Sequence, residues 1–143
     1  RLERVFNLEL ARMYGYLYQN TDKNFTVLHA LDGYDEISLT GNTKTISNNS
    51  EAMLTPADFG VEKVTQEEIT GGDDISESAQ IFMNVLQGRG TEAQNNVVCA
   101  NAGVAIATVK GITPKEGFER AKESLHSSKG LTALKKLQEL SRN

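Results

Sequence analysis

The sequence is poor in the features that mark specialised classes of protein. In 143 residues it has one cysteine, two prolines and no tryptophan. The single cysteine, Cys99, cannot form a disulfide within the chain, which argues against a disulfide-stapled secreted scaffold and favours a reducing cytoplasm. Because Cys99 lies between Val98 and Ala100, the sequence predicts a buried structural thiol.

Long hydrophobic runs and an excess of basic charge are also lacking. The most apolar run, residues 97–109, contains Asn101 and is too short to cross a bilayer. Fifteen basic against nineteen acidic residues give a net charge of −4, so we expect neither a membrane nor nucleic acid as a partner. A ligand that carries phosphate would need local help, such as a metal ion.

The start of the chain and its overall composition bound the domain organisation. The chain begins at Arg1, with neither an initiator methionine nor a charged-then-apolar leader, and enters structured sequence almost at once. These features predict a truncation or a processed product. The 38% hydrophobic and 24% charged residues are typical of a globular protein, and the length predicts one compact domain.

The first half of the chain has the pattern of a parallel β-α-β unit. Residues 4–6 and 25–29 are rich in strand formers. Between them, Asn7 is placed as a helix cap, and one helical face is expected to carry Leu10, Met13, Tyr14 and Leu17. A helical crossover of this length favours parallel pairing of the two strands.

Residues 37–54 change to a period of two, which is typical of β-structure. Ile37 and Leu39 alternate with polar residues, Gly41-Asn42 predicts a tight turn, and residues 43–47 are predicted to form the returning strand. Residues 48–50 predict a second turn into a strand at 52–54. The expected fold class is therefore α/β, with a partial parallel sheet, an antiparallel β-meander and flanking helices.

The second half is predicted to be helical. Capping boxes with a hydroxyl or carboxylate, followed three residues later by Glu or Gln, begin at Asp74, Thr91 and Thr113, so helices should start near residues 75, 92 and 114. The expected apolar faces comprise Ile81, Phe82, Val85 and Leu86, then Val97, Val98 and Val104, then Phe118, Ala121 and Leu125. A last amphipathic helix carries Leu131, Leu134, Leu137 and Leu140.

Adjacent carboxylates follow the second predicted strand, in residues 29–36. Ligands of open α/β sheets bind at the carboxyl edge of the strands, and carboxylate oxygens beside substrate phosphates suit magnesium. Asp35 and Glu36 are the candidate ligands. The alternative is that both are solvated turn residues, and on pattern alone that alternative is the stronger one.

Residues 27–44 resemble one family closely. They include Asp32-Gly33-Tyr34-Asp35-Glu36-Ile37-Ser38, which is similar to the Asp-Gly-x-Asp-Glu-Ile-Ser segment of anthranilate phosphoribosyltransferases. Further blocks follow in the family's order. Residues 54–60 resemble its Pro-x-Asp-Phe-Gly segment, residues 70–88 its next block, and Asn101-Ala102 its Asn-Ala helix. The resemblance covers nearly the whole chain.

The resemblance implies a magnesium-dependent enzyme of tryptophan biosynthesis. In the family the Asp-Glu pair binds Mg²⁺, so the metal ligands transfer to Asp35 and Glu36. The implied reaction displaces pyrophosphate from phosphoribosyl pyrophosphate by the amine of anthranilate, giving phosphoribosyl-anthranilate. No nucleophilic or other catalytic residue of this chain is implied. The enzyme is expected to be a cytoplasmic homodimer.

The resemblance also implies that the chain is the carboxy-terminal part of a larger α/β domain, spanning residues 1–143. The family's amino-terminal helical domain and its phosphate-binding loop have no counterpart here, so the chain alone is expected to be inactive. Gly71-Gly72 looks like that loop but follows the Asp-Glu pair, and we interpret it as a turn and helix cap. Within the matched blocks, Ser78 replaces a usual asparagine and Ala30 a frequent glycine.

Two other functions stay open on the sequence. One is a noncatalytic binding or assembly domain of the same fold. The other is a related phosphoribosyltransferase or a nucleoside phosphorylase with a different acceptor. His29 and His126 are predicted to be structural or exposed rather than catalytic. Tyr14, Tyr16 and Tyr18 cannot share one helical face, so at least one should be exposed.

Overall fold

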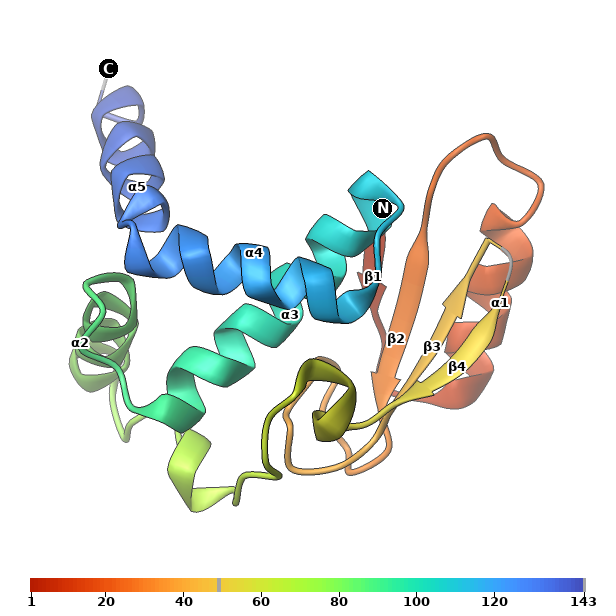
Figure 1. Cartoon of the computed structure of the whole chain (residues 1–143), viewed down its shortest axis with the longest axis horizontal. Helices are drawn as coiled ribbons and strands as arrows, with labels where there is room; N and C mark the ends of the chain where they lie inside the picture. Colours follow the sequence, from red (N-terminus) through yellow and green to blue (C-terminus); the bar gives the residue numbers. More distant parts are fainter. Residues whose placement is uncertain (49, 143) are drawn as a thin grey trace.

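The computed structural model describes residues 1–48 and 50–142. It consists of a four-stranded sheet with helices on both of its faces (Figure 1). The strands are β1 (Leu2–Arg4), β2 (Thr26–Ala30), β3 (Thr43–Ser47) and β4 (Glu51–Leu54), in that spatial order. β1 and β2 are parallel, and the other two pairs are antiparallel. The predicted α/β class, with a partial parallel sheet and an antiparallel meander, is confirmed.

Helix α1 (Leu8–Tyr18) makes the crossover between β1 and β2, and its cap is the predicted one. The side chain of Asn7 accepts a hydrogen bond of 2.7 Å from the backbone N–H of Leu10. The predicted apolar face is only partly correct: Leu10 and Tyr14 pack against the core, Met13 and Leu17 are exposed, and the buried positions are Ala11, Gly15 and Tyr18. Small residues face the sheet because α1 lies close to it: a Cβ on Gly15 would stand 3.0 Å from Ile46 Cγ2.

The predicted strand at residues 37–39 is wrong. β2 pairs directly with β3, and the residues between them form a loop. Ile37 and Leu39 are buried as the alternation implied, but Leu39 has a φ of 61°, which a strand cannot accommodate. The meander is therefore β2-β3-β4. Of the predicted turn at 48–50, Asn49 lies outside the described residues.

The helical half agrees with its predicted starts. The elements are the 3₁₀ helices η1 (Pro56–Phe59) and η2 (Glu67–Ile69), then α2 (Ile75–Leu86), α3 (Glu92–Lys110), α4 (Pro114–His126) and α5 (Lys129–Leu140). Thr91 and Thr113 form the predicted capping boxes. Asp74 caps α2, but Glu77 reaches back to the N–H of Asp73 rather than to that of Asp74.

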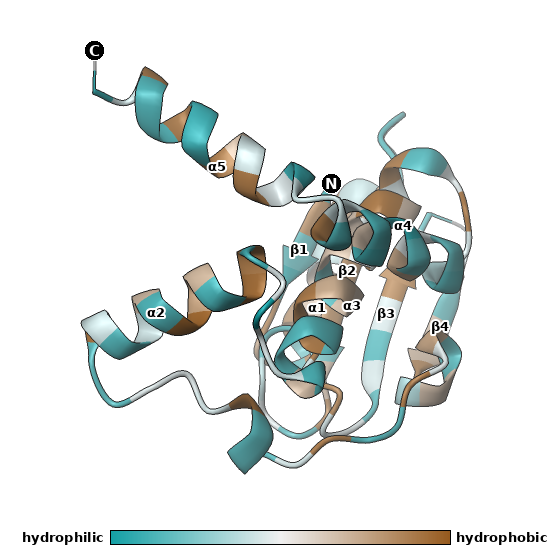
Figure 2. Cartoon of the chain, turned by 60° about the vertical axis from the view of Figure 1, so that its left-hand side comes forward, coloured by the Kyte–Doolittle hydropathy of each residue, from teal (hydrophilic) through white to brown (hydrophobic). Residues whose placement is uncertain are grey.

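The main core lies between the sheet and the α3–α4 pair. Phe59 and Phe118, with ring centroids 5.8 Å apart, are buried there, and all three predicted core positions of α4 are buried. The outer helices contribute less. Of the four apolar residues predicted for α2 only Val85 is buried, and α5 has no buried residue. Hydrophobic residues recur along both helices, which project from the body (Figure 2).

Within the described residues no single helix is long and apolar enough to cross a membrane. Only α3 and α4 taken together pass such a test of length and composition, and they meet at an angle of 118°.

Candidate functional site

The acidic segment lies in the loop of residues 31–42, at the carboxyl end of β2. The base of the loop is closed by a hydrogen bond of 2.9 Å from the N–H of Leu31 to the carbonyl of Asn42. Because β1 and β2 are parallel, the carboxyl end of β1, at Arg4, lies at the same edge. The loop therefore occupies the edge where open α/β sheets bind ligands.

Asp32 organises the interior of this loop. Its carboxylate accepts hydrogen bonds from the hydroxyls of Ser38, at 3.2 Å, and Thr40, and Ser38 and Thr40 are buried. Gly41 packs against it so closely that a Cβ would lie 2.8 Å from Asp32 Oδ2. The carboxylate of Asp32 thus makes its hydrogen bonds within the loop itself. Sequence reasoning did not single it out; its only local signal is the pair of hydroxyl residues six and eight positions later.

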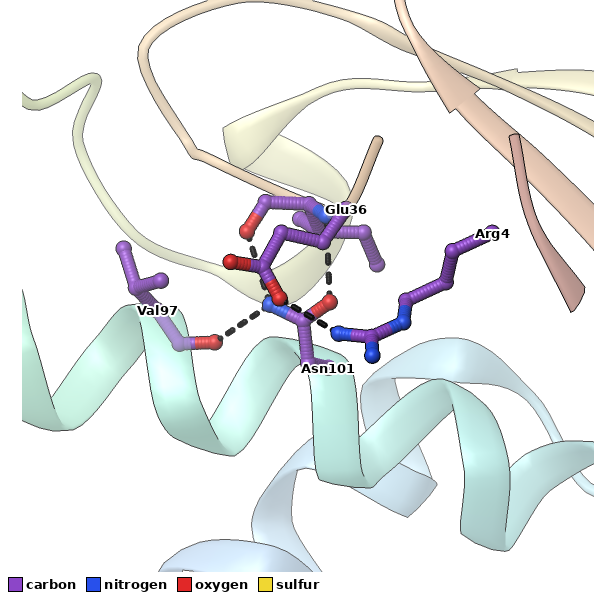
Figure 3. Close-up of polar contacts among 5 residues, drawn as sticks. Arg4, Glu36, Val97 and Asn101 are labelled. Carbon is purple, nitrogen blue, oxygen red and sulfur yellow. Dashed lines mark hydrogen bonds and ion pairs between the residues drawn. The ribbon is translucent and has the colours of Figure 1, made fainter. Parts of the chain in front are cut away.

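Asn101 of α3 joins the other side of the loop to the helical layer (Figure 3). Its Oδ1 accepts from the N–H of Ile37 at 3.0 Å, and its Nδ2 donates to the carbonyl of Ile37 at 2.7 Å. The same Nδ2 donates to the carbonyl of Val97, one turn earlier, at 3.0 Å. The residue that interrupts the most apolar run of the sequence is therefore a contact between α3 and the loop.

The two predicted metal ligands lie on the outer side of the loop. Asp35 is exposed and, within the described part of the chain, has no hydrogen-bond or ion-pair partner. Glu36 forms an ion pair with Arg4, with 2.6 Å between Glu36 Oε2 and Arg4 Nη1 (Figure 3). Both side chains of this pair are about half exposed, at 52% for Arg4 and 44% for Glu36. The structure thus places both carboxylates at the predicted edge, with one of them paired to a cation.

The donor set is compatible with magnesium. Two carboxylates from adjacent residues supply hard oxygen ligands, and Mg²⁺ is commonly held by one or two carboxylates together with waters and substrate phosphates. No group of three or more His, Cys, Asp or Glu side chains that could form a full metal cage occurs among residues 1–48 and 50–142. Such a site would therefore depend on water and ligand oxygens. Arg4 holds one carboxylate oxygen of Glu36, Oε2, and so competes with an ion for that oxygen.

The other reactive side chains have structural environments. His29 is buried, and its Nδ1 lies 2.9 Å from the carbonyl of Val5, so Nδ1 carries the proton and donates. Burial raises the pKa of the Cys99 thiol, which agrees with the predicted structural role. Tyr16 is 68% exposed, whereas Tyr18 is buried and donates to Glu3 at 3.0 Å. Burial, and then that hydrogen bond, raise the pKa of Tyr18.

Gly71-Gly72 lies in the turn that leads into α2. The side chain of Asp74 accepts from the N–H of Glu77 at 2.8 Å, and the hydroxyl of Ser78 donates to the carbonyl of Gly71 at 2.7 Å. Two backbone N–H groups at this helix start, those of Asp73 and Glu77, are thus bound by side chains of the same turn. This is the turn and cap expected from the sequence.

A separate cavity of about 490 Å³ opens at the opposite end of β2. It is lined by residues of β2, β3, α3 and the loop after α3, including Phe25, Thr26, Thr45, Val104 and Thr108. None of its lining residues in the described part of the chain is charged. The cavity and the carboxylate loop are therefore different places, and the ionisable chemistry lies at the loop.

Comparison with curated proteins identifies close relatives of this chain. It is 69% identical over 141 residues to an anthranilate phosphoribosyltransferase of Flavobacterium psychrophilum, a match that covers 99% of the chain and 43% of the relative. It is 64% identical over 143 residues to the enzyme of that name from Christiangramia forsetii, covering 100% of the chain and 43% of the relative. The chain thus spans less than half the length of these relatives.

Solved structures share the fold. Anthranilate phosphoribosyltransferase from Saccharomyces cerevisiae, in complex with PRPP (phosphoribosyl pyrophosphate) and Mg, superposes with a TM-score of 0.81 at 26% identity, over 94% of this chain and 39% of that one. The enzyme from Thermus thermophilus gives a TM-score of 0.84 at 24% identity, over 93% and 40%.

A family model decides the membership. The model described as the a/b domain of the glycosyl transferase family matches residues 3–131, which include nearly all of the sheet, the carboxylate loop and α1 to α4. By this match the chain belongs to the glycosyl transferase family, and the matched residues fall within the a/b domain of that family.

Proposed function

We propose that this chain is part of an anthranilate phosphoribosyltransferase. The protein would transfer the phosphoribosyl group of PRPP to the amine of anthranilate, releasing pyrophosphate, in tryptophan biosynthesis. The proposal is supported by relatives of that name that are up to 69% identical and match nearly the whole chain. It is also supported by a shared fold with a yeast enzyme of that name, solved with PRPP and Mg.

Within that enzyme the role proposed for this chain is to hold magnesium through Asp35 and Glu36. The observation that carries this assignment is the position of the loop at the carboxyl edge of β1 and β2, with both carboxylates on its outer side. Magnesium bound there would offset the charge that develops on the departing pyrophosphate. The chain would bind and orient, since the acceptor amine is itself the nucleophile.

The rest of the site is assigned outside this chain. Because the matched relatives are more than twice as long, we propose that residues 1–143 form the carboxy-terminal part of the α/β domain. The phosphate-binding loop, the helical domain and the homodimer contact of a cytoplasmic enzyme would lie in the part of the relatives that the match does not cover. The chain alone would then lack activity.

A chimera tests the proposal directly. The 141 matched residues of the Flavobacterium psychrophilum relative are replaced by those of this chain, and the decrease of anthranilate fluorescence is followed with PRPP and Mg²⁺. The expected result is turnover by the chimera and none by the chain alone. The double variant Asp35→Asn with Glu36→Gln should abolish turnover while the chimera keeps its fold by circular dichroism.

Two outcomes would count against the proposal, and each points elsewhere. A folded chimera that never consumes anthranilate would contradict the acceptor, and other acceptors or a noncatalytic role would then be tested with the same protein. Turnover that persists in the double variant would contradict the metal ligands and leave the reaction assignment intact.

A further inference from the structure

We propose that Asn101 is a positioning residue for the metal carboxylates: it fixes the conformation of the loop that carries Asp35 and Glu36, and so sets the affinity of the site for a divalent cation. The inference rests on the metal role proposed above. It assigns a function to a residue of α3 that would contact neither the ion nor the substrate.

The contact has the form of a complete amide-to-backbone pairing. Asn101 accepts from the N–H of Ile37 and donates to the carbonyl of the same residue, at 3.0 and 2.7 Å. Its second amide hydrogen goes to the carbonyl of Val97 at 3.0 Å, which holds the side chain in one orientation. Both amide hydrogens and the carbonyl oxygen are therefore used, and the loop backbone is bound as a neighbouring strand would bind it.

The position of this pairing along the loop determines what it controls. Residues 31–36 are exposed or half-buried, whereas Ile37, Ser38, Leu39 and Thr40 are buried. Ile37 directly follows Glu36, so the hydrogen bond from the N–H of Ile37 to Asn101 fixes the peptide plane between Glu36 and Ile37. The carboxylate pair is thus held at the boundary between the exposed and the buried part of the loop.

Asparagine at position 101 does not stabilise the helix itself. Asn101 is half-buried and lies one turn before the buried Val104 on α3, and asparagine is a poor residue for a helix interior. Burying a polar side chain costs free energy unless its hydrogen-bonding groups find partners. The side chain of Asn101 finds these partners in the loop, at Ile37. Within the described chain it makes no other hydrogen bond outside α3.

The test measures cation binding and loop opening rather than turnover. Mn²⁺, which prefers the same oxygen ligands as Mg²⁺, is titrated into the 143-residue chain and followed by electron paramagnetic resonance. Asn101→Ala is compared with Asn95→Ala, which removes another asparagine of the same helix whose amide donates to Gly90, away from the loop. Asn101→Leu fills the space if the alanine variant fails to fold. Amide hydrogen exchange at Ile37 reports loop opening in each variant.

The expected result is a loss of Mn²⁺ affinity of about 10- to 100-fold in both Asn101 variants, the range found when residues that orient metal ligands are removed. Exchange at Ile37 should accelerate in the same variants, while Asn95→Ala retains the affinity and the exchange rate of the parent. An Asn101 variant that binds Mn²⁺ as tightly as Asn95→Ala, in a chain whose binding needs Asp35 and Glu36, would overturn the role of Asn101 and leave the metal assignment standing. If the parent chain and the chimera both fail to bind Mn²⁺, the metal assignment fails, and the positioning role with it.

Discussion

Two turns of this molecule share a composition and differ in what their carboxylates do. Residues 32–36 and residues 70–74 each combine glycine with aspartate next to a second acidic residue. In the second turn Asp74 accepts the N–H of Glu77, and Glu77 in turn accepts the N–H of Asp73. In the first, Asp32 accepts hydrogen bonds from two hydroxyls of the loop. Glu36 pairs with Arg4, and Asp35 has no partner among the described residues.

The difference lies in the backbone that follows each turn. A helix start offers unpaired N–H groups, and nearby carboxylates satisfy them. In the loop after β2 the N–H of Ile37 is bound by Asn101, and no backbone N–H of the described residues donates to the carboxylate of Asp35 or Glu36. Carboxylates that no local donor takes up are available to a cation. The same residue types therefore make a helix cap in one turn and a candidate metal site in the other.

The largest expected effect comes from removing each acidic pair. Asp35→Asn with Glu36→Gln should lower Mn²⁺ affinity by more than about 100-fold, because both proposed ligands lose their charge. Asp73→Asn with Asp74→Asn removes the same two charges from the other turn, and asparagine still caps a helix. That control should stay within about twofold of the parent in calorimetric or resonance titrations, since it leaves the proposed ligands in place. Equal losses in the two variants would mean that overall charge, and not a site, attracts the ion.

One glycine beside each turn, Gly41 packed against Asp32 and Gly72 within the second turn, can be substituted to compare the two turns. Gly41→Ala would place a Cβ 2.8 Å from Asp32 Oδ2 and push that carboxylate away from Ser38 and Thr40. Gly72→Ala would place one 2.9 Å from Glu77 Cγ at a φ of +89°, a conformation that costs a residue with a side chain roughly 1–2 kcal/mol. Both variants should lose about 1–3 kcal/mol of unfolding free energy in urea.

Only Gly41→Ala should also weaken Mn²⁺ binding, by about tenfold, since it alone disturbs the loop that holds the carboxylates. The two variants form a matched pair, because their stability losses are similar and their effects on the ion are not. Loss of binding in Gly72→Ala at equal stability would show that binding follows overall stability instead of the loop.

Arg4 tests whether the ion pair at the loop competes with the cation. Arg4→Met frees Glu36 from its partner and should raise Mn²⁺ affinity up to about fivefold, because a half-exposed ion pair contributes at most about 1 kcal/mol. Arg1→Met is the control: Arg1 pairs with Glu3 rather than with the loop, and its loss changes net charge equally. A rise of the same size in both variants would be an effect of net charge alone.

The sequence predicted local structure well because its signals are local. The hydroxyl and carboxylate caps at Asp74, Thr91 and Thr113 determined three helix starts, and each depends only on residues close by in the chain. The strand predicted at 37–39 was wrong because the alternation of Ile37 and Leu39 reflects burial in a loop. That loop is held by Asn101, 64 residues away, and no periodicity contains such a contact.

The same reason explains the uneven prediction of the site. Asp35 and Glu36 were proposed as ligands from a contiguous motif, and their position at the sheet edge followed from the parallel pairing of two strands. Arg4 as the partner of Glu36 lies 32 residues away, and Asp32 was passed over because its role depends on a loop conformation. On α1 the apolar face was only partly predicted because close packing of Gly15 on Ile46, and not hydrophobicity alone, decides which side meets the sheet.

The smallest expected effect concerns a carboxylate that acts purely as a cap, and it sharpens the contrast with Asp35 and Glu36. The backbone N–H of Thr113, and then its hydroxyl, hold the pKa of Glu116 below its usual value of 4.5. Stabilisation by ionised Glu116 should therefore be fully present above about pH 4.5 and be lost as the pH falls through its lower folded pKa. In urea unfolding from neutral pH down into acid, Glu116→Gln should be less stable than the parent at neutral pH and approach it in acid. Glu119→Gln, an exposed position of the same helix, is the control. If the loss of unfolding free energy in Glu116→Gln stays constant across this pH range, the ionisation of Glu116 does not contribute to the stability of the cap.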